Sequence, residues 1–209
     1  MKYEELEEKL NFITHYIGTG MAIAGCIALI VHAVKAGQID YIVGSAIFGG
    51  ALILMYSMSG TYHLLEGGKI KRIFKILDHS AIYILISASY TPYLLTVLTG
   101  RSRWVLFAFQ WGLTFLGIIF KIKFAGKFEI LSTIIYIIMG WVVVFVFKDL
   151  KLNLNSTSLN LLVIGGVVYT VGAVFYSLKR IRFTHAIWHL FVIGGSVLNY
   201  LSVYNIISL

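Results

Sequence analysis

The chain has 209 residues, of which 59% are hydrophobic and only 12% are charged. A soluble domain averages about 25% charged residues, so this composition excludes a water-soluble globule. The single proline and single cysteine also exclude collagen-like and disulfide-stapled classes. An integral membrane protein remains, and at about 20 residues per span the length allows roughly six to eight helices.

Seven apolar segments of helix length follow one another along the chain. They are continuous rather than alternating, which favours helices over the strands of a β-barrel. The connectors are short, so we expect one membrane domain over residues 1–209. The predicted fold is all-α, a seven-transmembrane-helix bundle with spans at Ile13–Val34, Tyr41–Tyr62, Leu77–Thr99, Trp104–Phe120, Ile130–Phe147, Leu159–Leu178 and Thr184–Ile207.

The first residues, 1–12, precede the first span. Leu6 and Leu10 follow helical spacing among four glutamates, which predicts a short interfacial helix leading into the membrane. A cleavable signal peptide would begin with basic residues, and this segment is acidic.

The net charge of +8 is unevenly distributed over the loops. Of the 17 Lys and Arg residues, 12 fall in the N-terminus and the even-numbered loops and five on the other face. By the positive-inside rule, the N-terminus is cytoplasmic and the C-terminus lies outside. Orientation in the cell membrane and attraction to lipid headgroups then explain the basic charge, without nucleic acid as a partner. The twelve include Lys2 at the N-terminus, Lys121, Lys123 and Lys127 in the fourth loop, and Lys179 and Arg180 in the sixth.

Three histidines are candidate metal ligands. The predicted topology places His63 at the cytoplasmic end of the second span, at the depth where His185 and His189 begin the seventh. His185 and His189 are spaced i, i+4, so both imidazoles project from one helix face. Three neutral nitrogen ligands with an open fourth position are typical of catalytic zinc. The alternative is a histidine pair at the interface without a metal.

Asp78 and Ser59 fall at the same depth and are the candidate catalytic residues. Asp78 would hold or deprotonate a zinc-bound water. The alternatives are that Asp78 caps the third span and that Ser59 bonds to its own helix. His79 is less suited as a ligand because it lies about 100° around the helix from Asp78. His32, alone at the outer end, is interpreted as an interfacial residue.

Glu8, Asn11 and His15 form a polar stripe at the start of the first span. This stripe is either the polar face of an interfacial helix or a support that hydrogen-bonds to the metal-bearing helices. We favour support over direct ligation.

Three motifs in this order resemble the hemolysin III family of the progestin and adiponectin receptor superfamily. They are E-K-L-N-F-I-T-H (Glu8–His15), S-G-T-Y-H with L-D-H-S-A-I-Y (Ser59–His63 and Leu77–Tyr83), and H-A-I-W-H (His185–His189). The resemblance covers essentially the whole chain. It implies a seven-helix bundle with a cytoplasmic N-terminus and an intramembrane zinc.

The resemblance also assigns roles to residues and to the protein. It implies that His63, His185 and His189 hold the zinc and that Asp78 contacts the zinc through water. The family is similar to alkaline ceramidases, which suggests hydrolysis of an amide or ester bond in a lipid. Some relatives are associated with cytolysis, and others with membrane-fluidity homeostasis.

The leading hypothesis is therefore a zinc-dependent lipid amide or ester hydrolase, or a membrane-lipid homeostasis factor, with lipids as surroundings and as substrate or ligand. Asp78 would act on the water, and Ser59 would stabilise the oxyanion. The rivals are a zinc-clamped lipid sensor or receptor without turnover, and a pore-forming cytolysin. A retinal protein needs a lysine in a late span, and the seventh has none. A bis-histidine haem would show a Soret band.

Overall fold

The computed structural model describes residues 3–124, 126–178 and 182–207, and every regular element in these ranges is a helix. The all-α prediction is therefore confirmed. Lys2, Lys179 and Arg180 of the charge count lie outside the described residues. The elements are α1 Tyr3–Ala36, α2 Ile39–Leu64, α3 Gly68–Thr96, α4 Gly100–Phe124, α5 Glu129–Gly140, the 3-10 helix η1 Val142–Val146, α6 Phe147–Asn153, α7 Ser156–Ser177 and α8 Thr184–Tyr204.

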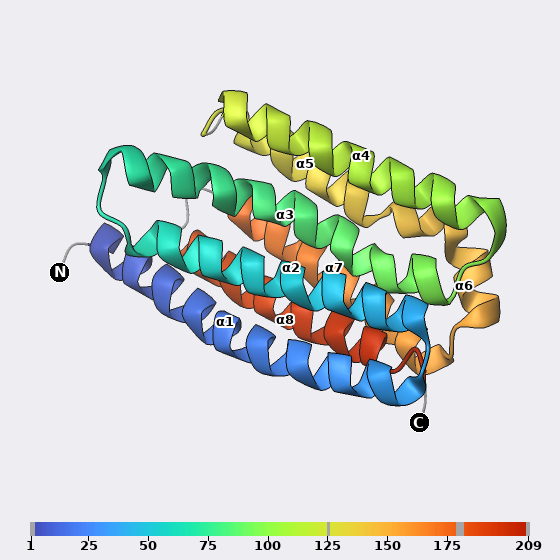
Figure 1. The fold of residues 1–209 in the computed structure, drawn as a ribbon. Coiled ribbons are helices and arrows are strands. Elements are labelled where there is room, and N and C mark those ends of the chain that lie inside the picture. Colours follow the sequence, from blue (N-terminus) through green and yellow to red (C-terminus); the bar gives the residue numbers. More distant parts are fainter. Residues whose placement is uncertain (1–2, 125, 179–181, 208–209) are drawn as a thin grey trace.

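The long helices lie side by side along one bundle (Figure 1). The helices α1, α2 and α8 pack together on one side, and α4 and α5 lie beyond α3 on the other. Short connections join antiparallel neighbours, so α2 ends and α8 begins at the end of the bundle where α1 begins. This topology brings the histidines of α2 and α8 to one end.

Six of the helical segments are long and apolar enough to cross a membrane: α1, α2, α4, residues 129–153, α7 and α8. The chain is thus a multi-pass membrane protein. Four basic residues open α3, whose buried face also carries polar side chains. It runs beside α2 and α4 for their full length (Figure 1). A seventh crossing by α3 and a cytoplasmic N-terminus stay predictions.

The first helix runs without interruption from Tyr3 to Ala36. The residues predicted to form an interfacial helix are therefore continuous with the first span. Their position at a membrane interface stays a prediction. Because the helix is continuous through this junction, Glu8 and His15 keep the register that the stripe requires.

The fifth apolar segment, predicted as one span, is broken in the middle, where α5 ends at Gly140. A break inside a membrane requires other partners for the freed backbone groups. Gln110 Nε2 donates to Met139 O at 2.9 Å, and the Tyr90 hydroxyl donates to Gly140 O at 2.5 Å. The same hydroxyl accepts from Val143 N at 2.9 Å. Side chains of α3 and α4 thus supply hydrogen bonds to the backbone groups at the break.

The prediction that Lys121 lies in a loop is wrong. It lies inside α4, is only 1% exposed, and donates from Nζ to Ser132 Oγ at 2.6 Å. The apolar segment ended before this residue in the sequence, but the helix continues through it to Phe124 because α5 supplies a polar partner. Counting loop charges has no means of detecting such a partner.

Removing the Tyr90 hydroxyl tests its role at the helix break. We expect Tyr90→Phe to lower the free energy of unfolding by about 1–3 kcal/mol, because it leaves the Gly140 carbonyl and the Val143 N–H without the Tyr90 partner at the helix break. Reversible unfolding in mixed micelles measures this change. The control is Tyr200→Phe, whose hydroxyl makes no hydrogen bond within the described residues. Equal stabilities of the two variants would contradict this role.

Candidate metal centre

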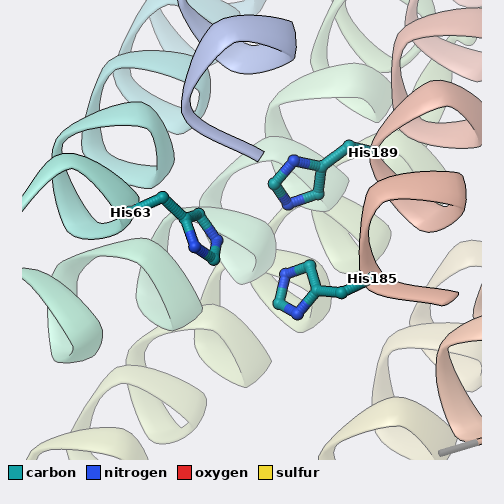
Figure 2. Close-up of side chains that lie close together, drawn as sticks. All are labelled: His63, His185 and His189. Atoms are coloured by element: carbon teal, nitrogen blue, oxygen red, sulfur yellow. The ribbon is translucent and has the colours of Figure 1, made fainter. Parts of the chain in front are cut away.

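Three imidazoles from two helices converge at one end of the bundle (Figure 2). His63 lies in the last turn of α2, and His185 and His189 lie in the first two turns of α8. Their ring centroids are 4.8 to 5.1 Å apart. One nitrogen from each ring lies within 4.8 Å of the other two. This cluster, the histidine triad, has the composition of a metal site.

Two of the rings are oriented by hydrogen bonds from α1. His63 Nδ1 lies 2.8 Å from Glu8 Oε2, and His189 Nδ1 lies 3.3 Å from the Thr14 hydroxyl. In metal sites such bonds fix the tautomer and turn the other nitrogen toward the ion. His63 Nε2 is buried and has no hydrogen-bond partner within the described residues. A metal ion would satisfy this atom.

The triad suits zinc in its donor chemistry. Neutral imidazoles bind zinc and other first-row transition metals, and three protein ligands leave a fourth position for water or substrate. The carboxylate behind His63 also fixes the orientation of that ligand. These donors therefore fit the ion that the sequence predicts.

Asp78 and Ser59 lie beside the triad. Asp78 is buried on α3, within hydrogen-bonding reach of Ser59 and close enough to His63 for an electrostatic interaction. It lies well inside a helix that begins at Gly68, so the alternative that it caps this helix is wrong. Ser59 is buried on α2, one turn before His63. Their catalytic roles stay predictions.

The polar stripe of α1 packs against the triad. Asn11 and His15 are both buried, and the His15 ring stacks on the His189 ring with centroids 3.5 Å apart. Glu8 contacts His63 directly. The helix thus supplies side chains behind two of the three ligands. This arrangement is consistent with support rather than ligation.

Two other histidines lie outside the triad. His79 Nε2 lies 3.9 Å from Asp78 Oδ2, and the His79 carbonyl accepts from the Tyr136 hydroxyl. His32 lies at the opposite end, where its ring stacks on Tyr204 and its Nε2 lies 3.1 Å from Ile207 O. His32 is buried within the protein.

The sequence analysis missed Thr14, although it lies next to His15 on the same helix. The Thr14 hydroxyl lies near the polar stripe of α1, and this position could have indicated that Thr14 supports the metal site. Its main hydrogen bonds go to its own helix, at Leu10 O and Asn11 O, and such back-bonding hides a second role. Only the packing of α1 on α8 reveals the contact with His189.

A cavity of about 550 Å³ opens beside the triad. His15, Ser59, Asp78, His185 and His189 contribute to its wall at one end. Most of the remaining wall consists of apolar side chains of α3, α5, η1, α7 and α8. An apolar cavity with a few convergent polar groups is the usual form of a small-molecule site.

The fold and the site together define a helical membrane protein with a histidine cluster that could bind a metal at one end of the bundle. A family model described as "Haemolysin-III related" matches residues 3–200. The chain therefore belongs to the hemolysin III family, as the sequence motifs predicted.

Several named proteins are similar to this chain. "Hemolysin-3" of Bacillus cereus is 45% identical over 197 residues, covering 94% of this chain and 90% of its own length. A "Hemolysin-3 homolog" of Bacillus subtilis (strain 168) is 44% identical over 190 residues, covering 91% and 89%. The human "Monocyte to macrophage differentiation factor" is 29% identical over 169 residues, covering 76% and 68%. No solved structure gives a significant match.

The metal content of the purified protein tests the triad. We expect about one zinc ion per chain in the wild type and almost none in His63→Ala, because two imidazoles cannot complete the site. Elemental analysis by mass spectrometry measures the ratio. The control is His32→Ala, which removes a buried histidine at the opposite end. Equal zinc in His63→Ala and the wild type would refute the site.

Loss of the hydrogen bond between Glu8 and His63 should reduce zinc binding less than loss of His63 itself. Glu8→Gln should lower zinc affinity by about 10–100-fold without abolishing binding, because it removes the charge that orients and polarises His63. Competition with a chelator of known affinity measures the change. Glu4→Gln, an exposed position on the same helix, serves as the control. An unchanged affinity in Glu8→Gln would show that the carboxylate does not support the site.

Proposed function

We propose that the chain is a zinc-dependent hydrolase of the plasma membrane that cleaves an amide or ester bond in a lipid. The observation that carries this proposal is the proximity of the histidine triad to Asp78 and Ser59, which line an apolar cavity together with His185 and His189. A zinc ion held by the triad would supply Lewis-acid polarisation of the scissile carbonyl and an activated water.

Asp78 is the residue suited to move the proton. Its carboxylate is buried, lines the cavity, and lies near His63 and Ser59. In hydrolysis it would accept a proton from the attacking water and return it to the leaving group. The Ser59 hydroxyl would keep the carboxylate in place or donate to the developing oxyanion.

The α1 side chains would keep the ligands rigid during this reaction. Glu8 holds His63 and Thr14 holds His189, while His15 stacks over the His189 ring. A site whose ligands are fixed in advance loses little energy to reorganisation as charge develops. The supporting helix would therefore contribute to catalysis through the orientation of the ligands, although its His15 also lines the cavity.

The apolar length of the cavity suits a lipid chain. Side chains such as Leu94, Val143 and Leu150, which are several helical turns from the level of the triad, line it. An acyl chain placed there would present its carbonyl to the polar end. The same walls would exclude bulk water from the reacting bond.

The printed names of the Bacillus relatives contain the word hemolysin. A pore needs a continuous polar path through the membrane, whereas the polar residues of this cavity gather mainly at one end. Cleavage of membrane lipids is itself a route to lysis, so the proposed hydrolase accommodates the name. A sensor without turnover would use the same metal site but would need no base at Asp78.

Replacing the proposed base separates a hydrolase from a sensor. Asp78→Asn should lower kcat by about 10²–10⁴-fold while zinc content is retained, because the proton acceptor is lost and the triad is intact. Product release from ester and amide lipids in nanodiscs measures kcat. Asp149→Asn, an exposed aspartate on α6, is the control. Unaltered turnover in Asp78→Asn would contradict the role of Asp78. Turnover absent from the zinc-loaded wild type would favour the sensor.

A further inference from the structure

The polar end of the cavity contains a second group of side chains that the proposed reaction does not use. Lys121 on α4 is 1% exposed and lines the cavity together with Ser132 and Glu129 of α5. Its Nζ donates to Ser132 Oγ at 2.6 Å and lies 5.9 Å from the centre of the Tyr136 ring. A buried ammonium in a membrane helix is costly and marks a functional site by default.

A second ammonium, that of Lys75, interacts electrostatically with Lys121, although Lys75 is not among the residues that line the cavity. Lys75 of α3 acts electrostatically on Lys121, on Asp78 and on His79. Its side chain reaches over the turn between α4 and α5, where a Cβ at Gly126 would come within 2.9 Å of Lys75 Nζ. Two like charges that interact in this way repel each other unless anionic groups lie between or beside them.

Within the protein, Glu129 and Asp78 supply part of that negative charge. Asp78, however, belongs to the other side of the cavity, beside the triad. The hydrogen-bond partner of Lys121 is a neutral hydroxyl, which satisfies one of the three ammonium donors. The remaining donors suit the oxygens of an anionic ligand, and lysine binds phosphate as a point charge.

We propose that Lys121 and Lys75 form a subsite for the phosphodiester of a phospholipid, which makes phospholipids rather than uncharged ceramide-like lipids the substrate class. The inference rests on the proposed function, since it names the lipid that the same cavity takes. Asp78 acts electrostatically on Lys121 and on His63, so both sites share one end of the cavity. A phospholipid bound there would place its ester carbonyls, which lie next to the phosphate, near the triad.

A purely structural role for Lys121 makes a different prediction. A lysine that only fills space beside Tyr136 and Ser132 could be replaced by methionine, and lipid preference would not change. Binding selectivity therefore distinguishes the two roles. Stability alone does not.

The test compares two lipids with the same acyl chains, dioleoyl phosphatidylethanolamine and dioleoylglycerol. The apparent affinity of each for the full-length protein in detergent follows from the rise in unfolding temperature with lipid concentration. We expect the wild type to bind the phospholipid at least about tenfold more tightly, a difference of about 1.4 kcal/mol. Lys121→Met should abolish this preference, and Lys121→Arg should keep most of it.

Controls separate the subsite from general charge effects and from folding defects. Lys35→Met, at the opposite end of the bundle, should leave the preference unchanged. Lys75→Met should reduce it, which provides a second variant if Lys121→Met does not fold. Equal affinity of the wild type for the two lipids would overturn the proposal whatever the variants do. So would a loss of preference in Lys35→Met as large as that in Lys121→Met.

A titration with inorganic phosphate tests whether the subsite binds the phosphate group of a lipid or free phosphate. Stabilisation by millimolar phosphate that depends on Lys121, with no preference for the phospholipid, would assign the subsite to free phosphate and overturn the lipid assignment. The readout is binding and needs no turnover. If the wild type prefers the phospholipid but hydrolyses no lipid, only the proposed hydrolysis is rejected. If the wild type hydrolyses lipids but does not prefer the phospholipid, only the subsite is rejected.

Discussion

A polar group inside a membrane must find its partner within the protein, because lipid offers none. This constraint explains how the described part of the bundle is held together. The break after α5 exists because Tyr90 and Gln110 take over its freed backbone groups. Lys121 occupies a buried position because Ser132 Oγ accepts a hydrogen bond from its ammonium group. The His63 ring is buried because Glu8 binds one of its nitrogens.

The same constraint leads to the metal. When Glu8 engages Nδ1 of His63, Nε2 remains buried beside two further imidazoles. A neutral nitrogen acceptor in such a place is expensive unless an ion or a donor satisfies it. The contacts of α1 with α2 and α8 hold the rings in this arrangement in advance. The site therefore depends on a helix that supplies none of the three proposed ligands.

Much of this organisation could be predicted from the sequence, because apolar length and the spacing of rare polar residues are local signals. The pair His185 and His189 is an example, since i, i+4 spacing fixes one face of one helix. Where partners come from distant segments, prediction failed. Lys121 is predicted to lie in a loop because the apolar segment ends before it. The sequence does not show that its acceptor, Ser132, lies on a neighbouring helix. The contact of Thr14 with His189 spans 175 positions of sequence, so the place of Thr14 near the polar stripe of α1 does not identify its partner.

The central claim is that the three imidazoles hold one zinc ion beside Asp78. The most direct measurement is a crystal structure with an anomalous difference map at the zinc absorption edge. The account predicts a single strong peak between His63, His185 and His189, with distances of about 2.0–2.1 Å to one nitrogen of each ring. No peak at this position in zinc-supplemented crystals, or a peak bound by other residues, would contradict it.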